Sequence, residues 1–195
     1  MRESHVAVTL RRLGPGGTMG SDGTARGIRV SSGVALEIPL DHIVIATVIQ
    51  WRGRIALFRR SRRPSHDSGL WHCITGFLEA GATPEQQALE ELFEEAGLRV
   101  EELQALHRGG DLVITDGFGA PWLIHTFTAL TTRRRLTINW EHDSYRWTDP
   151  RKAKRFSNRV SWLDSVLDAT VTAPQQSRLL TTEPILRVEA TAASK

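Results

Sequence analysis

The pattern of apolar and polar positions predicts alternating strands and helices from about residue 41 onward. Ile43–Gln50 is a run of mainly β-branched residues, which is typical of a buried strand. Trp51–Arg54 has the character of a hairpin turn, and Ile55–Arg60 is predicted to return as the second strand. Further short strands are predicted at Trp71–Thr75, Asp111–Thr115, Trp122–Leu130, Leu136–Asn139 and Ser144–Thr148.

The segment Pro84–Ala96 carries the clearest helix signals in the chain. Thr83 can cap its first turn, and Gln86 three residues later can complete a capping box. Pro84 stands at the first helical position. Gly97 supplies the left-handed residue that commonly ends a helix. The sequence therefore predicts both ends of this helix.

A second amphipathic helix is predicted after Ser157, which can serve as its N-cap. Its apolar face would consist of Val160, Leu163, Val166 and Leu167. Because these residues recur at helical spacing, we expect them to pack against the core.

The two ends of the chain look peripheral. Val6–Leu10 alternates like a strand, Gly14–Gly27 has the composition of a glycine-rich loop, and Arg29–Ile38 could add an edge strand. From Thr181 onward a loose tail is expected. We therefore expect an N-terminal arm over residues 1–40, a folded domain over 41–170 and a C-terminal tail over 171–195.

The composition is that of an ordinary globular domain. Of the 195 residues 40% are hydrophobic and 24% charged, which is enough apolar material to bury a core. The single cysteine, Cys73, excludes an internal disulfide and a cysteine-only metal cage. No apolar run approaches the roughly 20 residues that cross a bilayer. The residues that follow Met1 lack the apolar stretch of a secretory signal, so we expect a cytoplasmic protein.

The helix predicted over Pro84–Ala96 separates two groups of side chains, at about 100° per residue. The apolar group is Leu89, Leu92, Phe93 and Ala96, and the acidic group is Glu91, Glu94 and Glu95. In a cleft with an effective dielectric of about 20, two unit charges about 6 Å apart repel by roughly 3 kcal/mol. A cation would offset that repulsion, and carboxylates suit Mg²⁺, which shares its coordination with substrate phosphates. The alternative is an acidic helix face that water solvates.

The residues from Gly76 to Leu98 resemble the Nudix box, the signature of hydrolases that act on nucleoside diphosphates linked to another group. The box is a Gly, a Glu after five residues, and Arg-Glu-apolar-any-Glu-Glu-any-Gly-apolar after seven more. The matching residues are Gly76, Glu91, Leu92, Glu94, Glu95, Gly97 and Leu98. Two positions depart from the pattern, because Ala82 replaces the first Glu and Glu90 replaces the Arg.

The resemblance extends beyond the box. Glu141–Trp147, the following Ser157–Arg159 and the upstream Leu70–Gly76 are similar to the branch that hydrolyses dATP and dihydroneopterin triphosphate. The similarity covers about Asp41 to Leu167. It implies an α/β fold, the Nudix α/β/α sandwich around a mixed sheet, to which residues 41–170 would correspond.

The resemblance also implies a metal site. Its ligands would be the carboxylates of Glu91, Glu94, Glu95 and Glu141, with Mg²⁺ as the cofactor and Mn²⁺ as a substitute. Glu94 or Glu141 would take the proton from an attacking water, and the sequence leaves the choice between these two open.

Three further residues are candidates for contacts to the substrate. Arg60, at the end of the second strand, could clamp a phosphate, although a surface arginine beside Arg59 and Arg62 is an equal alternative. The backbone near Thr75 and Gly76 could touch the substrate or the metal.

The two departures from the box allow two interpretations. Ala82 removes a partner of the absent arginine, so the changes at residues 82 and 90 can be one compensated swap. Alternatively the pocket has decayed, which would leave a catalytically weak module that binds a nucleotide and regulates something else. Because the three glutamates after residue 90 are all present, we favour retained hydrolysis.

The leading hypothesis is therefore a Mg²⁺-dependent pyrophosphohydrolase that cleaves a diphosphate linkage in a nucleoside triphosphate or a related phosphorylated metabolite. The expected partner is this small molecule, not a membrane or a nucleic acid. RNA binding through Arg59–Arg63 and Arg133–Arg135 is a weaker third hypothesis, since a net charge of +3 does not indicate it. The sequence leaves open whether the N-terminal arm forms a homodimer.

Overall fold

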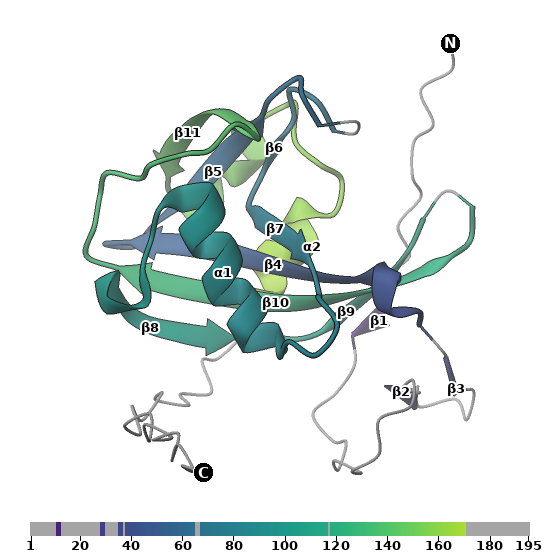
Figure 1. Ribbon diagram of the computed structural model, residues 1–195. Helices are drawn as coiled ribbons and strands as arrows, with labels where there is room; N and C mark the ends of the chain where they lie inside the picture. Colours follow the sequence, from purple (N-terminus) through teal and green to yellow (C-terminus); the bar gives the residue numbers. More distant parts are fainter. Residues whose placement is uncertain are drawn as a thin grey trace, which may run out of the picture.

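The protein is described from a computed structural model, in which a twisted sheet lies between two helices (Figure 1). The structure describes residues 38–64, 67–116 and 118–170, and the backbone of three short strands nearer the N-terminus. The predicted strand Val6–Leu10, the loop Gly14–Gly27, most of Arg29–Ile38 and the tail beyond residue 170 lie outside this description.

The helices and strands follow one another in the order β1 (Arg11–Arg12), β2 (Ile28–Arg29), β3 (Ala35–Leu36), η1 (Leu40–His42), β4 (Ile43–Trp51), β5 (Arg54–Arg60), β6 (Trp71–His72), β7 (Ile74–Phe77), α1 (Pro84–Ala96), η2 (Val100–Glu102), β8 (Leu103–Arg108), β9 (Leu112–Thr115), β10 (Pro121–Thr131), β11 (His142–Thr148), η3 (Pro150–Arg155) and α2 (Leu163–Thr170). The confirmed predictions include the first hairpin, the helix α1 and the strands β9, β10 and β11.

The sheet is mixed. Its main path runs β1-β9-β10-β4-β5-β11, with β6 beside β5, β7 beside β4 and β8 beside β10. β10 and β4 are parallel, from Leu123 opposite Ile43 to Leu130 opposite Gln50. The other strand pairs are antiparallel. This pairing confirms the α/β class and the α/β/α sandwich.

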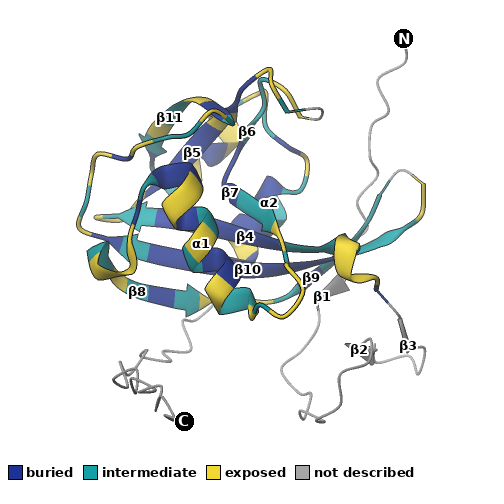
Figure 2. Ribbon diagram, in the orientation of Figure 1, coloured by how far each residue is buried: buried dark blue, intermediate teal, exposed yellow. Residues whose placement is uncertain are grey.

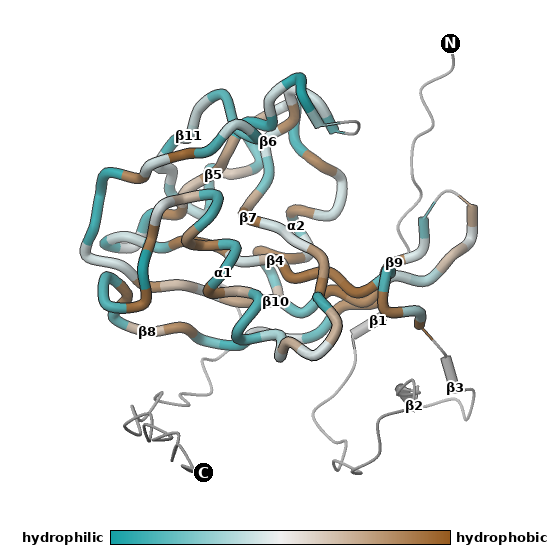
Figure 3. Tube along the Cα trace, in the orientation of Figure 1, coloured by the Kyte–Doolittle hydropathy of each residue, from teal (hydrophilic) through white to brown (hydrophobic). Residues whose placement is uncertain are grey.

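The core forms two layers because side chains alternate across the sheet. On β4, Ile45 and Ile49 pack on the α1 side, whereas Ala46 and Val48 pack on the α2 side. The central strands β4 and β10 are mostly buried, and α1 exposes its outer face (Figure 2). The hydropathy colouring shows the same division between apolar central strands and polar connections (Figure 3). The sheet therefore provides a rigid base for both helices.

The ends of α1 form as predicted. The Thr83 hydroxyl accepts a hydrogen bond from the Gln86 N–H at 3.2 Å, and the Gln86 side chain accepts one from the Thr83 N–H at 2.9 Å. Gly97 ends the helix with φ of +63°. Because only glycine adopts this conformation without strain, the position of the helix end is well determined.

The predicted strand at Leu136–Asn139 is wrong. These residues form no regular structure, because their backbone groups bond to other partners. The Leu136 N–H donates to the Tyr145 hydroxyl at 3.1 Å, and the Thr137 N–H donates to the carbonyl of Ala96 at 3.0 Å. The segment thus fastens the end of α1 to the approach of β11.

The predicted start of the second helix is also wrong, since α2 begins at Leu163 and not at Ser157. The residues before it pair with the backbone of Trp71 instead. The Trp71 N–H donates to the Asn158 carbonyl at 2.7 Å, and the Val160 N–H donates to the Trp71 carbonyl at 3.1 Å. The apolar residues Leu163, Val166 and Leu167 still pack against the sheet as predicted.

Two strands differ from the sequence prediction in other ways. The predicted strand Trp71–Thr75 is divided at Cys73, so that β6 pairs with β5 and β7 pairs with β4. β8 was not predicted, although it forms an antiparallel ladder with β10. Among the described residues, no helix has the length and apolar character that crossing a membrane requires.

Replacing Gly97 with alanine is expected to destabilise the fold more than the same change at Gly53. Both glycines have positive φ, which costs a side-chain-bearing residue about 1–2 kcal/mol. A Cβ on Gly97 would also lie 2.8 Å from the Thr137 Cβ, whereas a Cβ on Gly53 would meet nothing within 4 Å. Urea unfolding of both variants measures the difference, and equal losses would show that the Thr137 contact yields freely.

Candidate functional site

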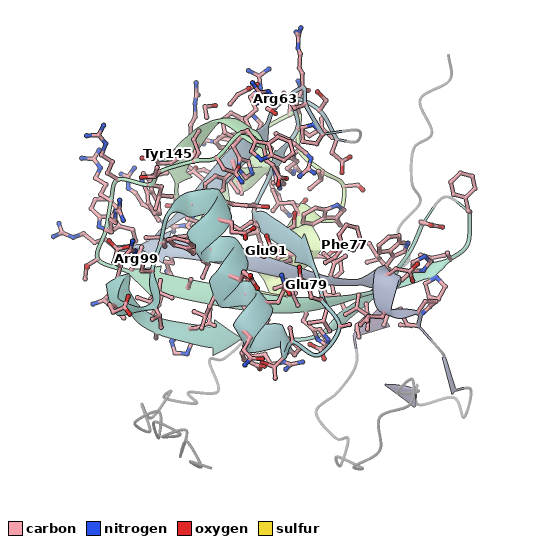
Figure 4. All side chains as sticks on the ribbon, viewed as in Figure 1. Arg63, Phe77, Glu79, Glu91, Arg99 and Tyr145 are labelled. Carbon is pink, nitrogen blue, oxygen red and sulfur yellow. The ribbon has the colours of Figure 1, made fainter. Side chains whose placement is uncertain are left out.

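Carboxylates from α1 and from the start of β11 meet above the end of β5 and the backbone of β7. The contributing residues are Arg60 on β5, Thr75 and Gly76 on β7, Glu91 and Glu95 on α1, and Glu141 immediately before β11. Glu91 lies where α1 faces β7, with Glu79 in the loop that joins them (Figure 4). The fold therefore gathers segments that are distant in sequence.

Glu95 is the most buried member of this site, with 2% of its surface exposed. Its carboxylate has a backbone hydrogen bond from Thr75, while Oε2 has no hydrogen-bond partner in the part of the chain that the structure describes. Burial, followed by the charges of Glu141 and Glu91, raises the pKa of Glu95 to about 9. Without a bound metal ion, Glu95 is therefore protonated at neutral pH even beside Arg60.

Glu91 is half-buried, and its carboxylate lies directly against the backbone of Gly76. A Cβ at residue 76 would overlap the Glu91 carboxylate, so glycine is required for this approach. Burial, together with the charges of Glu94 and Glu141, raises the pKa of Glu91 to about 7. A hydrogen bond from the Gln87 side chain opposes this rise.

Arg60 points into the site, as one of its two predicted interpretations required. It is 9% exposed, and its Nη2 lies 3.6 Å from Glu141 Oε2. Its buried Nε has no hydrogen-bond partner in the described structure. The Ser61 N–H donates to the Glu141 carbonyl at 2.7 Å, which holds the Glu141 backbone against the end of β5.

Glu94 is exposed on α1, although its charge acts on the half-buried Glu91. The predicted division of the helix into an apolar and an acidic face is wrong in two respects. Phe93 is 51% exposed and packs under the Arg99 guanidinium, whereas Glu95 belongs to the buried face with Leu92. At about 100° per residue, Glu95 lies between Glu91 and Leu92, at the margin of the core.

Sequence reasoning did not identify His142, which lies beside Glu95. Its Nε2 is 3.7 Å from Glu95 Oε2, and both of its ring nitrogens are buried without a hydrogen-bond partner in the described structure. The ring packs between Phe58 and His72. Burial, with the nearby charge of Arg60, lowers the pKa of His142 to about 4, so the imidazole is neutral at pH 7.

Gln87 was also missed, since an amide inside a helix carries no chemical signature in a single sequence. It is 3% exposed, and its Nε2 donates to Glu91 Oε1 at 3.0 Å. Its Oε1 accepts a hydrogen bond from the Glu79 N–H at 3.2 Å. The only signal was its position one turn before Glu91.

The donors present fit Mg²⁺. Carboxylate oxygens are the ligands that this ion prefers, the Glu91 carboxylate lies against the Gly76 backbone, and Glu95 Oε2 has no hydrogen-bond partner among the described residues. Within the described ranges, no three His, Cys, Asp or Glu side chains enclose an ion by themselves.

The arginine clusters of the third hypothesis have structural partners. Arg133 donates to Glu102 at 2.7 Å and to the Gly97 carbonyl at 3.0 Å, which secures the end of α1. Arg59 donates to the Gly69 carbonyl at 3.4 Å. These two side chains therefore contribute to the fold.

Comparison with known proteins gives a consistent family. A model described as the NUDIX domain matches residues 40–168. An octanoyltransferase of Myxococcus xanthus is 33% identical over 120 residues, covering 57% of this chain and 31% of that protein. An RNA pyrophosphohydrolase of Gluconacetobacter diazotrophicus is 27% identical over 117 residues, covering 58% and 63%. The chain thus spans less than two thirds of these relatives.

Solved structures share the fold. The Escherichia coli dihydroneopterin triphosphate pyrophosphohydrolase has a TM-score of 0.54 at 21% identity, covering 68% of this chain and 96% of that one. The NUDIX domain of Shewanella oneidensis NrtR, solved with ADP ribose, has a TM-score of 0.53 at 15% identity, covering 72% and 90%. At these identities the likeness establishes the sandwich architecture alone.

Replacing Gly76 with alanine is expected to displace the Glu91 carboxylate while leaving the fold intact. The new Cβ would meet the far end of a flexible side chain, which can rotate away at little cost. We expect divalent-metal affinity to fall by about 10-fold or more, the range for a disturbed ligand environment. Titration of Mn²⁺ by calorimetry tests this, and unchanged affinity with an unchanged melting temperature would contradict it.

Proposed function

The chain belongs to the Nudix family, and from that premise we propose that it is a Mg²⁺-dependent pyrophosphohydrolase. Its substrate would be a nucleoside triphosphate or a related phosphorylated metabolite, cleaved at a diphosphate linkage. The Escherichia coli relative of like fold is a dihydroneopterin triphosphate pyrophosphohydrolase, and a curated relative is an RNA pyrophosphohydrolase. Both act on diphosphate linkages, which supports this reaction class.

One observation carries the proposal: the charges of Glu91, Glu95 and Glu141 act on one another in a partly buried site. Burial and this mutual repulsion raise the pKa of Glu91 to about 7 and that of Glu95 to about 9. The Arg60 guanidinium opposes the rise at Glu95. A divalent cation would stabilise all three carboxylates in their ionised form.

The ligands would come from residues already close to one another. Glu91 and Glu95 would hold Mg²⁺ from one side, with Glu94 and Glu141 at the outer margin. Bound there, Mg²⁺ would neutralise phosphate charge and lower the pKa of a bound water. The Glu91 carboxylate contacts the backbone of Gly76, and the Glu95 carboxylate accepts a hydrogen bond from the backbone of Thr75.

The chain supplies the remaining chemistry through two side chains. Arg60 would bind a phosphate oxygen, since its buried Nε has no hydrogen-bond partner among the described residues and its Nη2 lies 3.6 Å from Glu141 Oε2. Glu141 would accept the proton from the attacking water, because its side chain is 25% exposed and so within reach of water. Glu94, which is more exposed, is the other candidate base.

A catalytically weak module that binds a nucleotide and regulates another process is the second candidate function. Two observations favour it: the box departs at Ala82 and Glu90, and the NUDIX domain of NrtR, of like fold, was solved with ADP ribose. Under this interpretation the protein binds a nucleotide without turning it over. Binding measured beside turnover separates the two functions.

A substrate panel with matched variants tests the enzymatic proposal. Purified protein is mixed with Mg²⁺ and nucleoside triphosphates, dinucleoside polyphosphates, ADP-ribose or 5′-triphosphorylated RNA, and the release of phosphate or pyrophosphate is measured. Glu94→Gln, which removes a candidate base, and Glu95→Gln, which removes a proposed metal ligand, are each expected to reduce turnover by about 100-fold or more. The Glu95 change should preserve stability, because that carboxyl is already uncharged without metal.

The controls use residues outside the site. Glu101→Gln removes an exposed acid at η2 and should leave turnover unchanged. Turnover that survives the Glu95 change, or that needs no divalent ion, would contradict the metal assignment. Nucleotide binding without turnover by the wild-type protein would favour the regulatory function.

A further inference from the structure

Gln87 is a buried amide that joins the loop before α1 to a carboxylate of the site. Its Oε1 accepts from the Glu79 N–H at 3.2 Å, and its Nε2 donates to Glu91 Oε1 at 3.0 Å. Only 3% of its surface is exposed. One side chain thus connects the β7–α1 loop to Glu91.

The burial of this amide calls for an explanation. A buried polar group costs free energy unless it is hydrogen-bonded. Its helical neighbours Ala88 and Leu92 are apolar and pack into the core. Because both ends of the Gln87 amide are bonded, the position stabilises one particular geometry of the loop and of Glu91.

The Nudix box of this chain provides no ionic connection between the same two segments. Ala82 has no charge, and Glu90 lies exposed on α1. In the described structure no salt bridge joins residues 78–82 to α1. Among the described residues, apart from the capping bonds of Thr83, one side-chain hydrogen bond joins this loop to the helix, from the Glu79 N–H to Gln87 Oε1.

We propose that Gln87 is a positioning residue that holds Glu91 in the orientation needed to bind the divalent cation, in place of the charged residues missing at 82 and 90. This inference rests on the proposed function. Gly76 confines the Glu91 carboxylate on one side, and the Gln87 amide fixes Oε1 on another. A carboxylate held in this way pays less entropy when it binds an ion.

The test compares Gln87→Met with Gln86→Met. Methionine fills the same space without either hydrogen bond, and Mn²⁺ affinity, measured by calorimetry or by electron paramagnetic resonance, should fall by about 10-fold or more. The Gln86 change removes an exposed capping bond, so it should lower the melting temperature without changing Mn²⁺ affinity. Gln87→Asn, whose shorter amide cannot reach both partners, should weaken Mn²⁺ binding as well.

A double-mutant cycle shows whether Gln87 acts through Glu91. In a Glu91→Gln background, the Gln87→Met change should alter Mn²⁺ affinity by less than about 2-fold, because the group that it positions is gone. An equal loss of affinity in both backgrounds would overturn the proposal. Wild-type affinity in the folded Gln87→Met and Gln87→Asn variants would overturn it as well.

The outcome for the wild-type protein separates this inference from the function on which it rests. If the wild-type protein neither binds Mn²⁺ nor hydrolyses any member of the substrate panel, the proposed function fails. If it does both, and Gln87→Met matches it in Mn²⁺ affinity, only the role of Gln87 fails. A fall in Mn²⁺ affinity that Gln86→Met does not share supports the positioning role.

Discussion

The burial of Glu95 beneath α1 is the constraint on which the site depends. An ionised carboxylate at 2% exposure is unstable unless positive charge or hydrogen-bond donors surround it. Thr75 supplies one backbone hydrogen bond and Arg60 a nearby charge, while Glu91 and Glu141 add repulsion. The native fold holds these groups together only because its core contributes more free energy than their proximity costs. Positive charge placed beside these carboxylates would lower that cost.

The core keeps these groups close together because it fixes the orientation of α1 about its own axis. Ala88, Leu92 and Ala96 pack against the sheet, so the helix cannot turn Glu95 toward water without exposing them. The end of α1 is held in addition by the Thr137 N–H, which bonds to the Ala96 carbonyl at 3.0 Å. The same segment continues to Glu141. The position of the end of α1 therefore also affects the position of the Glu141 carboxylate.

Local sequence signals predicted α1 and the hairpin well, since capping residues, a left-handed glycine and β-branched runs act over a few residues. The strand prediction at Leu136–Asn139 failed because the backbone of this segment bonds to Tyr145 and Ala96, which are tertiary contacts. The parallel pairing of β4 with β10 has no local signal either. The family pattern identified Glu91 and Glu95, but a helical period alone placed Phe93 inside and Glu95 outside, the reverse of what packing produced.

The position of Glu90 explains how the Nudix box could change there without disrupting the site. Glu90 lies on the exposed side of α1, where water screens its charge and a like-charge neighbour costs only a few tenths of a kcal/mol. Gln87 lies on the buried side, where an unsatisfied amide would cost about 1–3 kcal/mol. A surface ion pair can therefore be lost cheaply, whereas the buried amide and its two partners must be retained together. The contacts that hold the Glu91 carboxylate in position therefore lie on the inner face of the helix.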